Sequence, residues 1–597
     1  MLLISLVRMS NQQIAEVLRN VAAAYSIKDD KKFRFQILAY QKAADTIAHL
    51  NTEIIDYYKS GTLDSLPGIG TSIRAHLEEL IKTGKVKRFE WVFDGIPEAI
   101  FPLLSIPSFG PKKAYALVKH FSLKDPKTVI SDIEKLGIEG KIAPLPRFGE
   151  KSQSDILRAI SEFKEGKGKT TRMVLPYAHE IADKLVSYLK QLPDVEQAEP
   201  LGSLRRAVAT VGDIDIAVAS NYPKKVIEHF IAYPYKERVI EKGDVSASIL
   251  VSGGRQIDLM VQPPGSFGSL LQHFTGSKNH NVHLRELALK KGLSLSEYGI
   301  KFLKEKNKPL KNFKTEKEFY AQIGLDYIEP EIREDTGEIE LAAQNKLPNL
   351  VQLEDLKGDL HIHSNYPIEP SHDLGLSSME EMLDKAKTLG YEYLGFSEHN
   401  PSVSKHTSRE IVEILEKRNE KIEQIKSNNK SVRIFKLLEI DILPSGKLAI
   451  DEKAQNLLDA AVVSIHSVFS MDKNRMTQRV LAGLSYPKAK ILAHPTGRLL
   501  NIRPGYELDW DKIFDFCKKQ DKALEINSWP NRLDLPDTII RLAVENGVKL
   551  VINTDVHRVT QMDLSRYGIS LAKRGWAKKS DILNTLGYND FANWLKS

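Results

Sequence analysis

Short β-rich segments alternate with helical stretches from about residue 356 onward, and this alternation constrains the fold more than any other feature. Segments such as YLGFSEH, IFKLLEID, AAVVSIHS, KALEIN and KLVINTD each contain the apolar run of one buried strand. Since strands joined by helices usually run parallel, the pattern predicts βα units in a mainly parallel sheet or barrel.

The pattern of apolar residues differs in the first 340 residues. Residues 11–170 repeat apolar side chains with a helical period, which predicts helices separated by Gly and Pro turns. From about 195 to 262, GDIDIAVAS, SASILVSG and QIDLMVQ predict short strands. Residues 326–340 contain seven acids and one Arg, which predicts a linker. A chain of 597 residues exceeds one hydrophobic core, so we expect about four folding units.

The net charge of +7 is unevenly distributed. Residues 1–175 carry 27 Lys and Arg against 20 Asp and Glu, whereas the remaining 422 residues carry 58 of each. This positive first third indicates a polyanionic partner, although an ordinary solvated surface can carry the same surplus. No run of about 18 apolar residues occurs, so we expect no membrane span. Cys517 is the single cysteine, which fits a reducing compartment, and we expect a cytoplasmic protein.

A glycine hairpin motif occurs three times in the basic first third: LPGIGTSI, IPSFGPKKA and PRFGEKS. Each copy joins a hydrophobic residue, a tight turn and a predicted helix start, so its backbone N–H groups can face a phosphate oxygen. One copy is most often an ordinary turn between helices, but three copies favour contact with a nucleic-acid backbone. The residues expected at this contact are Gly68, Gly70, Phe109, Gly110, Phe148 and Gly149.

Two acids lie in the predicted strand VGDIDIAV. Because strand side chains alternate, Asp213 and Asp215 project from one face, and Asp258 lies on another predicted strand. Close carboxylates repel one another unless cations lie between them, and Mg²⁺ or Mn²⁺ prefers such oxygen ligands. Two ions about 4 Å apart can promote phosphoryl transfer. The turn GSLRR just upstream adds Arg205 and Arg206 as partners for a triphosphate, whereas DID alone is more often a solvated strand edge.

Histidines and acids recur at the ends of the predicted strands after residue 356, in GDLHIHS, FSEH, LLEID, SIHS, LAHPTGR and NTDVH. In a βα barrel the carboxyl ends of the strands meet at one rim, so these side chains are expected to converge. A lone HxH can be two surface histidines and a lone SIHS is more often a core histidine, but the repetition favours a metal site. Imidazole and carboxylate ligands suit Mn²⁺, Zn²⁺ or Fe²⁺.

The segment from about 10 to 325 resembles the family X DNA polymerases, the family that contains polymerase β. The resemblance depends on GSLRRAVATVGDID and on QIDLMVQPPGSFGSLLQHFTGSKNHNVHLRELALKKGLSLSEYGI. It implies that Asp213, Asp215 and Asp258 bind two Mg²⁺ or Mn²⁺ ions. It also implies that the nucleotide and the nascent pair are contacted by Gly202, Ser203, Arg206, Gly212, His273, Phe274, Gly276, Asn281 and Arg285.

Three positions depart from the animal members of that family. His273 occupies a place where the animal enzymes carry Tyr, which bears on sugar discrimination. Ser72 and His76 occupy places where lyase-competent relatives carry lysines, so we do not expect a polymerase β type of lyase activity.

The region from about 356 to 575 resembles the polymerase and histidinol phosphatase (PHP) domain, a distorted seven-stranded βα barrel that bacterial family X polymerases carry at the carboxyl end. The resemblance implies up to three Mn²⁺, Zn²⁺ or Fe²⁺ ions. Its implied ligands are His361, His363, Asp373, His399, Glu439, His466, His494, Asp555 and His557. The family's acid five residues after the HxH is replaced by Ile368, so Asp373 or His372 is expected to take its role.

These observations predict a multidomain α+β and α/β protein: helical helix-hairpin-helix domains, a nucleotidyltransferase palm and a C-terminal distorted (β/α)7 barrel. The expected domains are an 8-kDa-like domain (1–85), fingers (86–175), palm (176–262), thumb (263–325), linker (326–355) and PHP domain (356–597).

The predicted function is DNA-templated synthesis across short gaps in repair, with a 3′-5′ exonuclease and an abasic-site endonuclease in the PHP domain. The expected partners are gapped or primer-template DNA and deoxynucleoside triphosphates, and a monomer is expected. Two alternatives remain: a PHP phosphoesterase whose polymerase half only binds DNA, and an untemplated or small-molecule nucleotidyltransferase.

Overall fold

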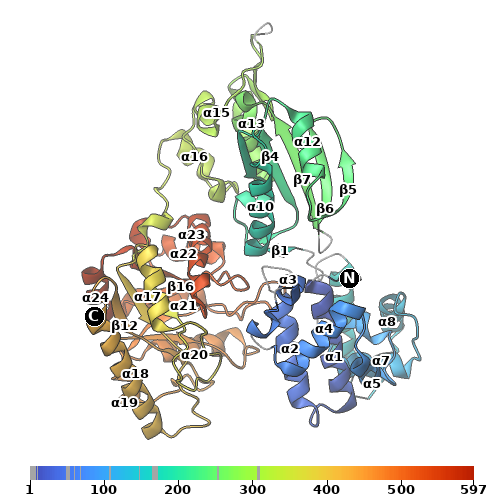
Figure 1. The fold of residues 1–597 in the computed structure, drawn as a ribbon, viewed down its shortest axis with the longest axis vertical. Coiled ribbons are helices and arrows are strands. Elements are labelled where there is room, and N and C mark those ends of the chain that lie inside the picture. Colours follow the sequence, from blue (N-terminus) through green and yellow to red (C-terminus); the bar gives the residue numbers. More distant parts are fainter. Residues whose placement is uncertain are drawn as a thin grey trace. The chain divides into compact units, whose positions relative to one another are not determined.

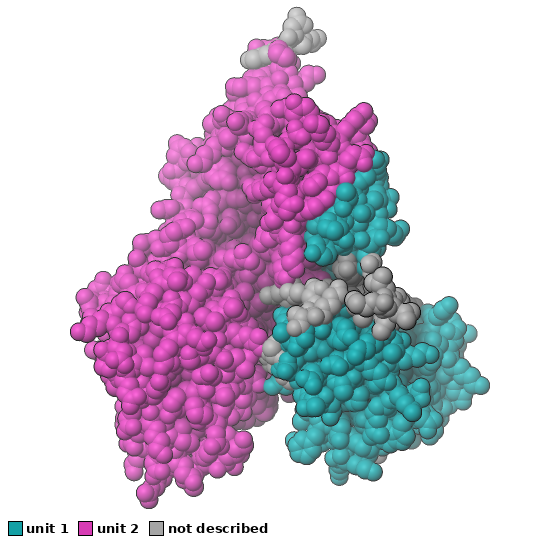
Figure 2. Space-filling view, viewed as in Figure 1, with its two compact units in different colours: residues 1–173, 231–242, 248–257 teal, residues 174–230, 243–247, 258–597 magenta. Residues whose placement is uncertain are grey.

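The computed structural model describes residues 9, 11–48, 54–59, 61–66, 69–106, 109–146, 148–164, 172–251, 255–305 and 309–597. The chain divides into two compact units, which Figure 2 colours separately. One unit comprises residues 1–173, 231–242 and 248–257, and the other comprises 174–230, 243–247 and 258–597. Across these described ranges, no helix combines the length and the apolar character needed to cross a membrane.

The first unit begins with helices, as the apolar period predicts (Figure 1). Two apolar clusters hold them together, one around Leu18, Tyr40 and Leu77 and the next around Leu117 and Ile133. The elements are α1 (Asn11–Asp29), α2 (Arg34–Ala48), α3 (Ile54–Lys59), η1 (Leu63–Ser65), α4 (Thr71–Thr83), α5 (Lys87–Phe93), α6 (Ile100–Leu103), α7 (Pro111–His120), α8 (Val129–Ile138) and α9 (Glu150–Lys164).

A central five-stranded sheet follows, in the order β2-β4-β7-β6-β5. The three strands that the sequence predicts here correspond to β4 (Ile214–Ala219), β6 (Ser246–Val251) and β7 (Arg255–Gln262). The other strands and the helices of this region are β1 (Met173–Val174), α10 (Leu175–Leu189), β2 (Gln197–Pro200), α11 (Gly202–Arg205), β3 (Thr210–Val211), α12 (Pro223–Ile231) and β5 (Lys236–Lys242).

A small helical region follows the sheet and includes the predicted linker 326–355. Its elements are η2 (Pro264–Ser266), α13 (Phe267–Thr275), α14 (Lys278–Lys290), β8 (Leu293–Ser296), β9 (Gly299–Phe302), α15 (Glu316–Gln322), η3 (Pro330–Ile332), α16 (Glu338–Ala343) and η4 (Leu353–Asp355). The supposed linker is folded, because Ile328, Ile332, Ile339 and Leu350 lie in the same buried cluster as Phe319. Its acids include Asp355, which caps η4, Glu334, which pairs with Arg574, and Glu338, which pairs with the buried His280. The acid count alone does not reveal these contacts.

The C-terminal region alternates strands and helices as predicted, and its neighbouring strands pair in parallel. Strands β10-β11-β12 form one sheet and β13-β14-β15-β16-β17 another. The strands are β10 (Gly358–Ile362), β11 (Tyr393–Phe396), β12 (Arg433–Lys436), β13 (Glu439–Asp441), β14 (Ala461–Ser464), β15 (Ala489–Leu492), β16 (Ala523–Asn527) and β17 (Lys549–Asn553).

Helices between these strands and after β17 cover the sheets and bury apolar faces (Figure 1). They are α17 (Met379–Thr388), α18 (Ser408–Asn428), α19 (Glu452–Gln455), α20 (Lys473–Leu484), α21 (Trp510–Lys519), α22 (Asp537–Glu545), η5 (Val559–Leu564), α23 (Ser565–Arg574), η6 (Lys579–Asp581), η7 (Leu583–Thr585) and α24 (Tyr588–Lys596). Phe591 and Trp594 of α24 pack with Leu360, Val462 and Val551 of the strands. This packing leaves the carboxyl ends of the strands for the polar side chains.

Candidate functional site

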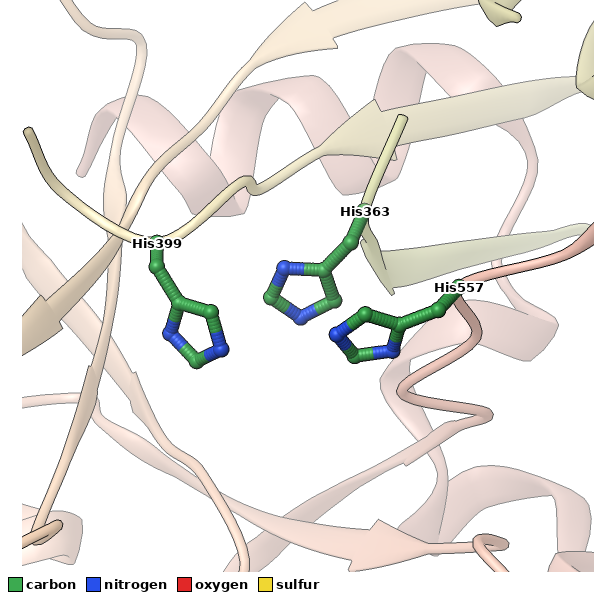
Figure 3. A group of neighbouring side chains, drawn as sticks. All are labelled: His363, His399 and His557. Atoms are coloured by element: carbon green, nitrogen blue, oxygen red, sulfur yellow. The ribbon is translucent and has the colours of Figure 1, made fainter. Parts of the chain in front are cut away.

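The histidines predicted at the strand ends do come together. His361 belongs to β10 and His363 follows it, while His399 follows β11 and His557 follows β17. The ring centroids of His363 and His557 are 4.2 Å apart, and those of His363 and His399 are 4.5 Å apart. Figure 3 shows these three rings beside one another on segments that are distant in the sequence. The βα alternation therefore produces the convergence that it predicts.

Glu439, the first residue of β13, lies at the centre of the histidines. Its Oε2 is 2.8 Å from Nδ1 of His399 and 3.3 Å from Nε2 of His361. Its Oε1 is 3.0 Å from Nε2 of His494 and 3.4 Å from that of His466. Burial alone would raise the pKa of this carboxyl, but the surrounding imidazoles hold the pKa well below its ordinary value.

Four sets of side chains place one ligand atom each within 4.8 Å of one another among the described residues. The sets overlap and share His363, His399, Glu439 and His466, so they form one connected centre. They are His363, His399 and His557; His361, His363 and Glu439; His372, Asp441 and His466; and His399, Glu439 and His466. Such overlap is what several neighbouring metal ions require of their ligands.

The buried nitrogens of this centre fit divalent metal ions. Nε2 of His361, both ring nitrogens of His363 and Nε2 of His557 are buried without a hydrogen bond. Nδ1 of His399 and Oε2 of Glu439 lie 2.8 Å apart but also lack hydrogen-bond geometry. Since buried polar atoms are nearly always satisfied, this concentration of orphaned ligand atoms indicates that cations complete the site.

Glu525 of β16 contacts two residues of the histidine centre, His361 and His494. The strand-end pattern did not identify this acid. Its Oε1 is 2.7 Å from Nδ1 of His361, which directs Nε2 of that ring toward Glu439. Its Oε2 accepts from the His494 backbone N–H at 2.7 Å. A carboxylate behind a ligating histidine fixes the tautomer and the orientation of the ring. The sequence signal was the acid inside the apolar strand KALEIN.

Of the two residues expected to replace the missing acid ligand, the structure places His372 in a ligand set, together with Asp441 and His466. Nε2 of His372 lies 3.1 Å from Oδ2 of Asp441, and Nδ1 of His466 lies 2.7 Å from Oδ1 of Asp441. Asp373 is exposed, and its negative charge acts on His557 and His372. Asp441 was missed, although LLEID places it two residues after Glu439, on the same side of a strand.

The three predicted carboxylates of the central sheet lie at neighbouring strands. Asp215 is on β4, Asp258 is on the adjacent β7, and Asp213 directly precedes β4. Burial, then Asp213 and then Asp258 raise the pKa of Asp215 to about 6. Their ligand atoms are less tightly grouped than the histidine centre, because none of the 4.8 Å sets found among the described residues includes them. The mutual repulsion is what a bound cation would relieve.

The turn next to these carboxylates is built on a glycine. Gly202 has a φ of +57°, and a Cβ added there would lie 3.4 Å from Oδ2 of Asp215. Ser203 is half-buried in the first turn of α11, and Gly212 is exposed beside Asp213. A side chain at residue 202 would thus be strained by the positive φ, and its Cβ would touch the carboxylate at an ordinary contact distance.

The predicted nucleotide and base-pair residues form a hydrogen-bonded group around α13 and α14. Nδ2 of Asn281 donates to the His273 carbonyl at 2.7 Å, and Arg285 Nη2 lies 3.2 Å from His273 Nδ1. Burial, followed by the Arg285 charge, lowers the pKa of His273, so its imidazole is neutral and can accept from Arg285. The Phe274 ring centroid lies 4.7 Å from that of His273, and a Cβ at Gly276 would approach Asn281 Oδ1 to 2.7 Å.

The two arginines of GSLRR have different partners. Arg205 is bidentate to Glu316 at 3.0 and 2.7 Å and also donates to Thr275 Oγ1, so this buried ion pair occupies its guanidinium. Arg206 donates from Nε to Glu334 at 2.9 Å and from Nη1 to the Thr275 carbonyl at 2.8 Å. Both terminal nitrogens of Arg205 are thus engaged, whereas these contacts of Arg206 use its Nε and Nη1 and leave Nη2 for a phosphate oxygen.

The three glycine hairpins have the same backbone arrangement. Gly70 and Gly110 are the N-cap residues of α4 and α7, and neither helix has a side-chain cap. Ile69, Phe109 and Phe148 each donate their backbone N–H to the residue three positions earlier, and Gly149 directly precedes α9. A Cβ at any of these three glycines would meet no atom within 4 Å. Gly68 lies outside the described residues.

His76, at one of the two positions where lyase-competent relatives carry a lysine, has a structural role. The Tyr40 hydroxyl lies 2.8 Å from Nδ1 of His76, and their rings stack with centroids 6.2 Å apart. Burial is the main cause that lowers the pKa of His76. The neutral, occupied ring offers no amine for a Schiff base.

Comparison with known proteins assigns the family. The helix-hairpin-helix domain family matches residues 9–86, and the DNA polymerase beta thumb family matches residues 270–334. Over 590 residues the chain is 33% identical to DNA polymerase/3′-5′ exonuclease PolX of Bacillus subtilis, covering 98% of this chain and all of the relative. The chain belongs to the PolX family. This relationship confirms the resemblance to bacterial family X polymerases that the motifs indicate.

Two further relatives of this PolX family member each cover a part of it. DNA polymerase lambda of Rattus norvegicus is 23% identical over 352 residues, 54% of this chain and 56% of the relative. A probable phosphatase of Clostridium acetobutylicum is 29% identical over 210 residues, 33% of this chain and 78% of the relative. The phosphatase match supports the resemblance to PHP domains.

Proposed function

We infer that the chain is a DNA-templated DNA polymerase that fills short gaps in DNA repair and removes nucleotides at a second, metal-dependent centre. The DNA polymerase and 3′-5′ exonuclease activities follow from membership of the PolX family. The observation that carries the proposal is the presence, in one chain, of a carboxylate cluster on the central sheet and a separate histidine-rich centre. Abasic-site cleavage is proposed as a further reaction of the histidine centre.

Asp213, Asp215 and Asp258 are proposed to hold two Mg²⁺ or Mn²⁺ ions. The raised pKa of Asp215 supports this assignment, because the charges that raise it would be neutralised by cations. Bound ions would supply activation of the primer 3′-hydroxyl and stabilisation of the leaving pyrophosphate. Arg206 would contact the triphosphate, and Arg285 and Asn281 would hold His273 at the nascent pair.

The nine residues proposed from the PHP resemblance, joined by His372 and Asp441, would hold up to three Mn²⁺, Zn²⁺ or Fe²⁺ ions. Bound ions would supply an activated water that attacks a phosphodiester near neutral pH. The protein contributes the orientation of the ligands, since Glu525 directs His361 and Asp441 directs His466. Asp373 lies close enough to act electrostatically on His557, which supports a place at the edge of this centre.

A distorted (β/α)7 barrel is the proposed architecture of this region. A parallel bridge joins Ile362 of the edge strand β10 to Val556, just after the edge strand β17, and another joins His399, which follows the middle strand β11, to Glu439 of the edge strand β13. Strands β12 and β13 are separated by only two residues, so they can count as one barrel strand. The helix starts at Gly70, Gly110 and Gly149 are proposed to bind DNA phosphates with backbone N–H groups, and α4 and α7 have no side-chain cap that would compete.

The boundaries proposed from the sequence are kept except that 326–355 packs with the thumb-like region. A monomer in the cytoplasm is the proposed state. The two alternatives are less favoured, because the full-length relative is itself a polymerase and exonuclease.

Extension and degradation of a 5′-phosphorylated gapped duplex would test the two-centre assignment. We expect Asp213→Ala to abolish synthesis and spare degradation, and His361→Ala to do the reverse. Each protein would be assayed with Mg²⁺ and with Mn²⁺, on templated and on single-stranded primers.

Matched controls make the same substitutions, Asp to Ala and His to Ala, at residues outside the two proposed metal centres. Asp244→Ala removes a carboxylate whose side chain is 86% exposed, and His406→Ala removes a histidine that lies beside Glu369 outside the four ligand sets. Both controls should keep both activities. Loss of synthesis and degradation together in Asp213→Ala or His361→Ala would refute the division between the two centres.

A further inference from the structure

Arg574, the last residue of α23, connects the C-terminal region to the segment that carries Arg206. Its Nη1 donates to the Arg206 backbone carbonyl at 2.9 Å and to Oε1 of Glu334 at 3.0 Å. Its side chain is only 7% exposed. A charged side chain of the histidine-rich region is therefore buried against the proposed nucleotide-binding arginine.

Glu334 is shared between the two arginines. The same Oε1 that accepts from Arg574 also accepts from Nε of Arg206 at 2.9 Å. The Thr275 carbonyl accepts from Nη1 of Arg206. Because a guanidinium has five N–H groups, these contacts fix its orientation and leave further donors for an anion.

Arg574 is held on its other side by its own region. Asp537, the first residue of α22, accepts from Nε of Arg574 at 2.7 Å, and its Oδ2 lies 2.6 Å from Nη2. This two-point contact sets the position of the guanidinium before it reaches Glu334. The placement of Arg206 thus depends on a part of the chain that performs different chemistry.

We propose that Arg574 is a positioning residue for binding of the incoming nucleoside triphosphate. It holds the Arg206 backbone and takes a share of the Glu334 charge. Without Arg574, Glu334 would pair with Arg206 alone, and the positive charge available to the triphosphate would fall. The inference rests on the proposed role of Arg206 in binding that triphosphate.

Lys573 provides a matched control at the same junction. Its Nζ lies 2.8 Å from Glu329 and 3.6 Å from Glu331, so its ion pairs go to the same segment but to neither Arg206 nor Glu334. Removal of Lys573 weakens the junction and leaves the shared carboxylate in place. If the KM for the triphosphate depends on Glu334 being shared by Arg206 and Arg574, Lys573→Ala should leave that KM unchanged.

The test is single-nucleotide incorporation on a gapped duplex by the full-length protein, with the triphosphate concentration varied. For Arg574→Ala we expect the KM for the triphosphate to rise about tenfold, as loss of one charge-assisted hydrogen bond predicts. The kcat at saturating triphosphate and the exonuclease rate should stay within about twofold of wild type, since the reacting groups are untouched. Arg574→Lys keeps the charge but loses the planar guanidinium that bonds to two partners, so it should give an intermediate KM. This variant replaces Arg574→Ala in the test if the alanine variant does not fold.

Three outcomes would overturn the inference. They are an unchanged KM in Arg574→Lys and Arg574→Ala, an equal rise in Lys573→Ala, and a loss confined to kcat. Arg206→Ala separates this inference from the function on which it rests. If Arg206→Ala also leaves the KM unchanged, the proposed triphosphate site itself is wrong; if only the Arg574 variants do so, the positioning role alone is wrong.

Discussion

Replacement of Glu316 by Gln should destabilise the region that carries the nascent-pair helices. Glu316 is buried at the start of α15 and pairs with two arginines, Arg205 at 2.7 Å and Arg333 at 2.5 Å. Arg333 is fully buried, and its Nε and Nη2 donate to the Ile328 carbonyl. Glutamine would leave the buried guanidinium of Arg333 and the half-buried guanidinium of Arg205 without their shared anion.

The magnitude follows from the pKa of the carboxyl. Burial alone would raise it, but Arg333 and Arg205 outweigh burial and lower the pKa of Glu316 from 4.5 to about 2. Since one pKa unit corresponds to about 1.4 kcal/mol, the ionised carboxylate contributes about 3 kcal/mol. This agrees with the roughly 3–5 kcal/mol lost when one partner of a buried ion pair is removed. The contribution is complete above the unfolded pKa and is lost as the pH falls through the folded pKa.

Hydrogen–deuterium exchange of the intact protein measures this local effect. A loss of about 3 kcal/mol should accelerate exchange of the protected amides in α15 by about a hundredfold at neutral pH. Because Phe319, Tyr320, Ile332 and Trp576 share one apolar cluster, the fluorescence of Trp576 should shift at lower denaturant in the same variant.

Glu318→Gln is the matched control, because it makes the same chemical change on the same helix. Glu318 accepts from the Thr315 backbone N–H in an exposed capping box, and glutamine can replace it there. We expect less than about 1 kcal/mol from this control. A change in exchange of less than about fivefold in Glu316→Gln would show that the buried network is not a major source of stability.

Three further predictions concern other sites. Asp441→Asn should lower the Mn²⁺ affinity of the histidine centre about 10- to 100-fold, measured by equilibrium dialysis, while extension persists, since Asp441 orients His466. Gly202→Ala should cost about 1–2 kcal/mol in urea unfolding, because its φ is +57°; an unchanged midpoint would contradict this. Burial chiefly lowers the pKa of His179, stacked on Tyr567, to about 4. Protonation therefore favours unfolding, and about 3 kcal/mol of stability is lost as the pH falls from 6.5 to 4; a His179→Phe variant that keeps the full pH slope of wild type would rule this out.

Local patterns in the sequence were enough to predict most of the helices and strands and the convergence of the histidines. The βα alternation brings His361, His399 and His557 to one end of the sheets. The strand pattern also placed Asp215 and Asp258 on strands, which are the neighbouring β4 and β7 of the structure. These inferences succeed because strand and helix periods depend on neighbouring residues, and because parallel strands all end on the same side.

Only the tertiary structure decided which charges pair with one another. Arg205 meets Glu316 across 111 residues of sequence, and Arg574 meets the Arg206 carbonyl across 368. The acids of 326–340 looked like a solvated linker for the same reason, since Glu338 is buried against His280. Residues that are more than 100 positions apart in the sequence leave no periodic pattern that would reveal their contact. A charge is stable in the interior only where the fold brings a partner to it.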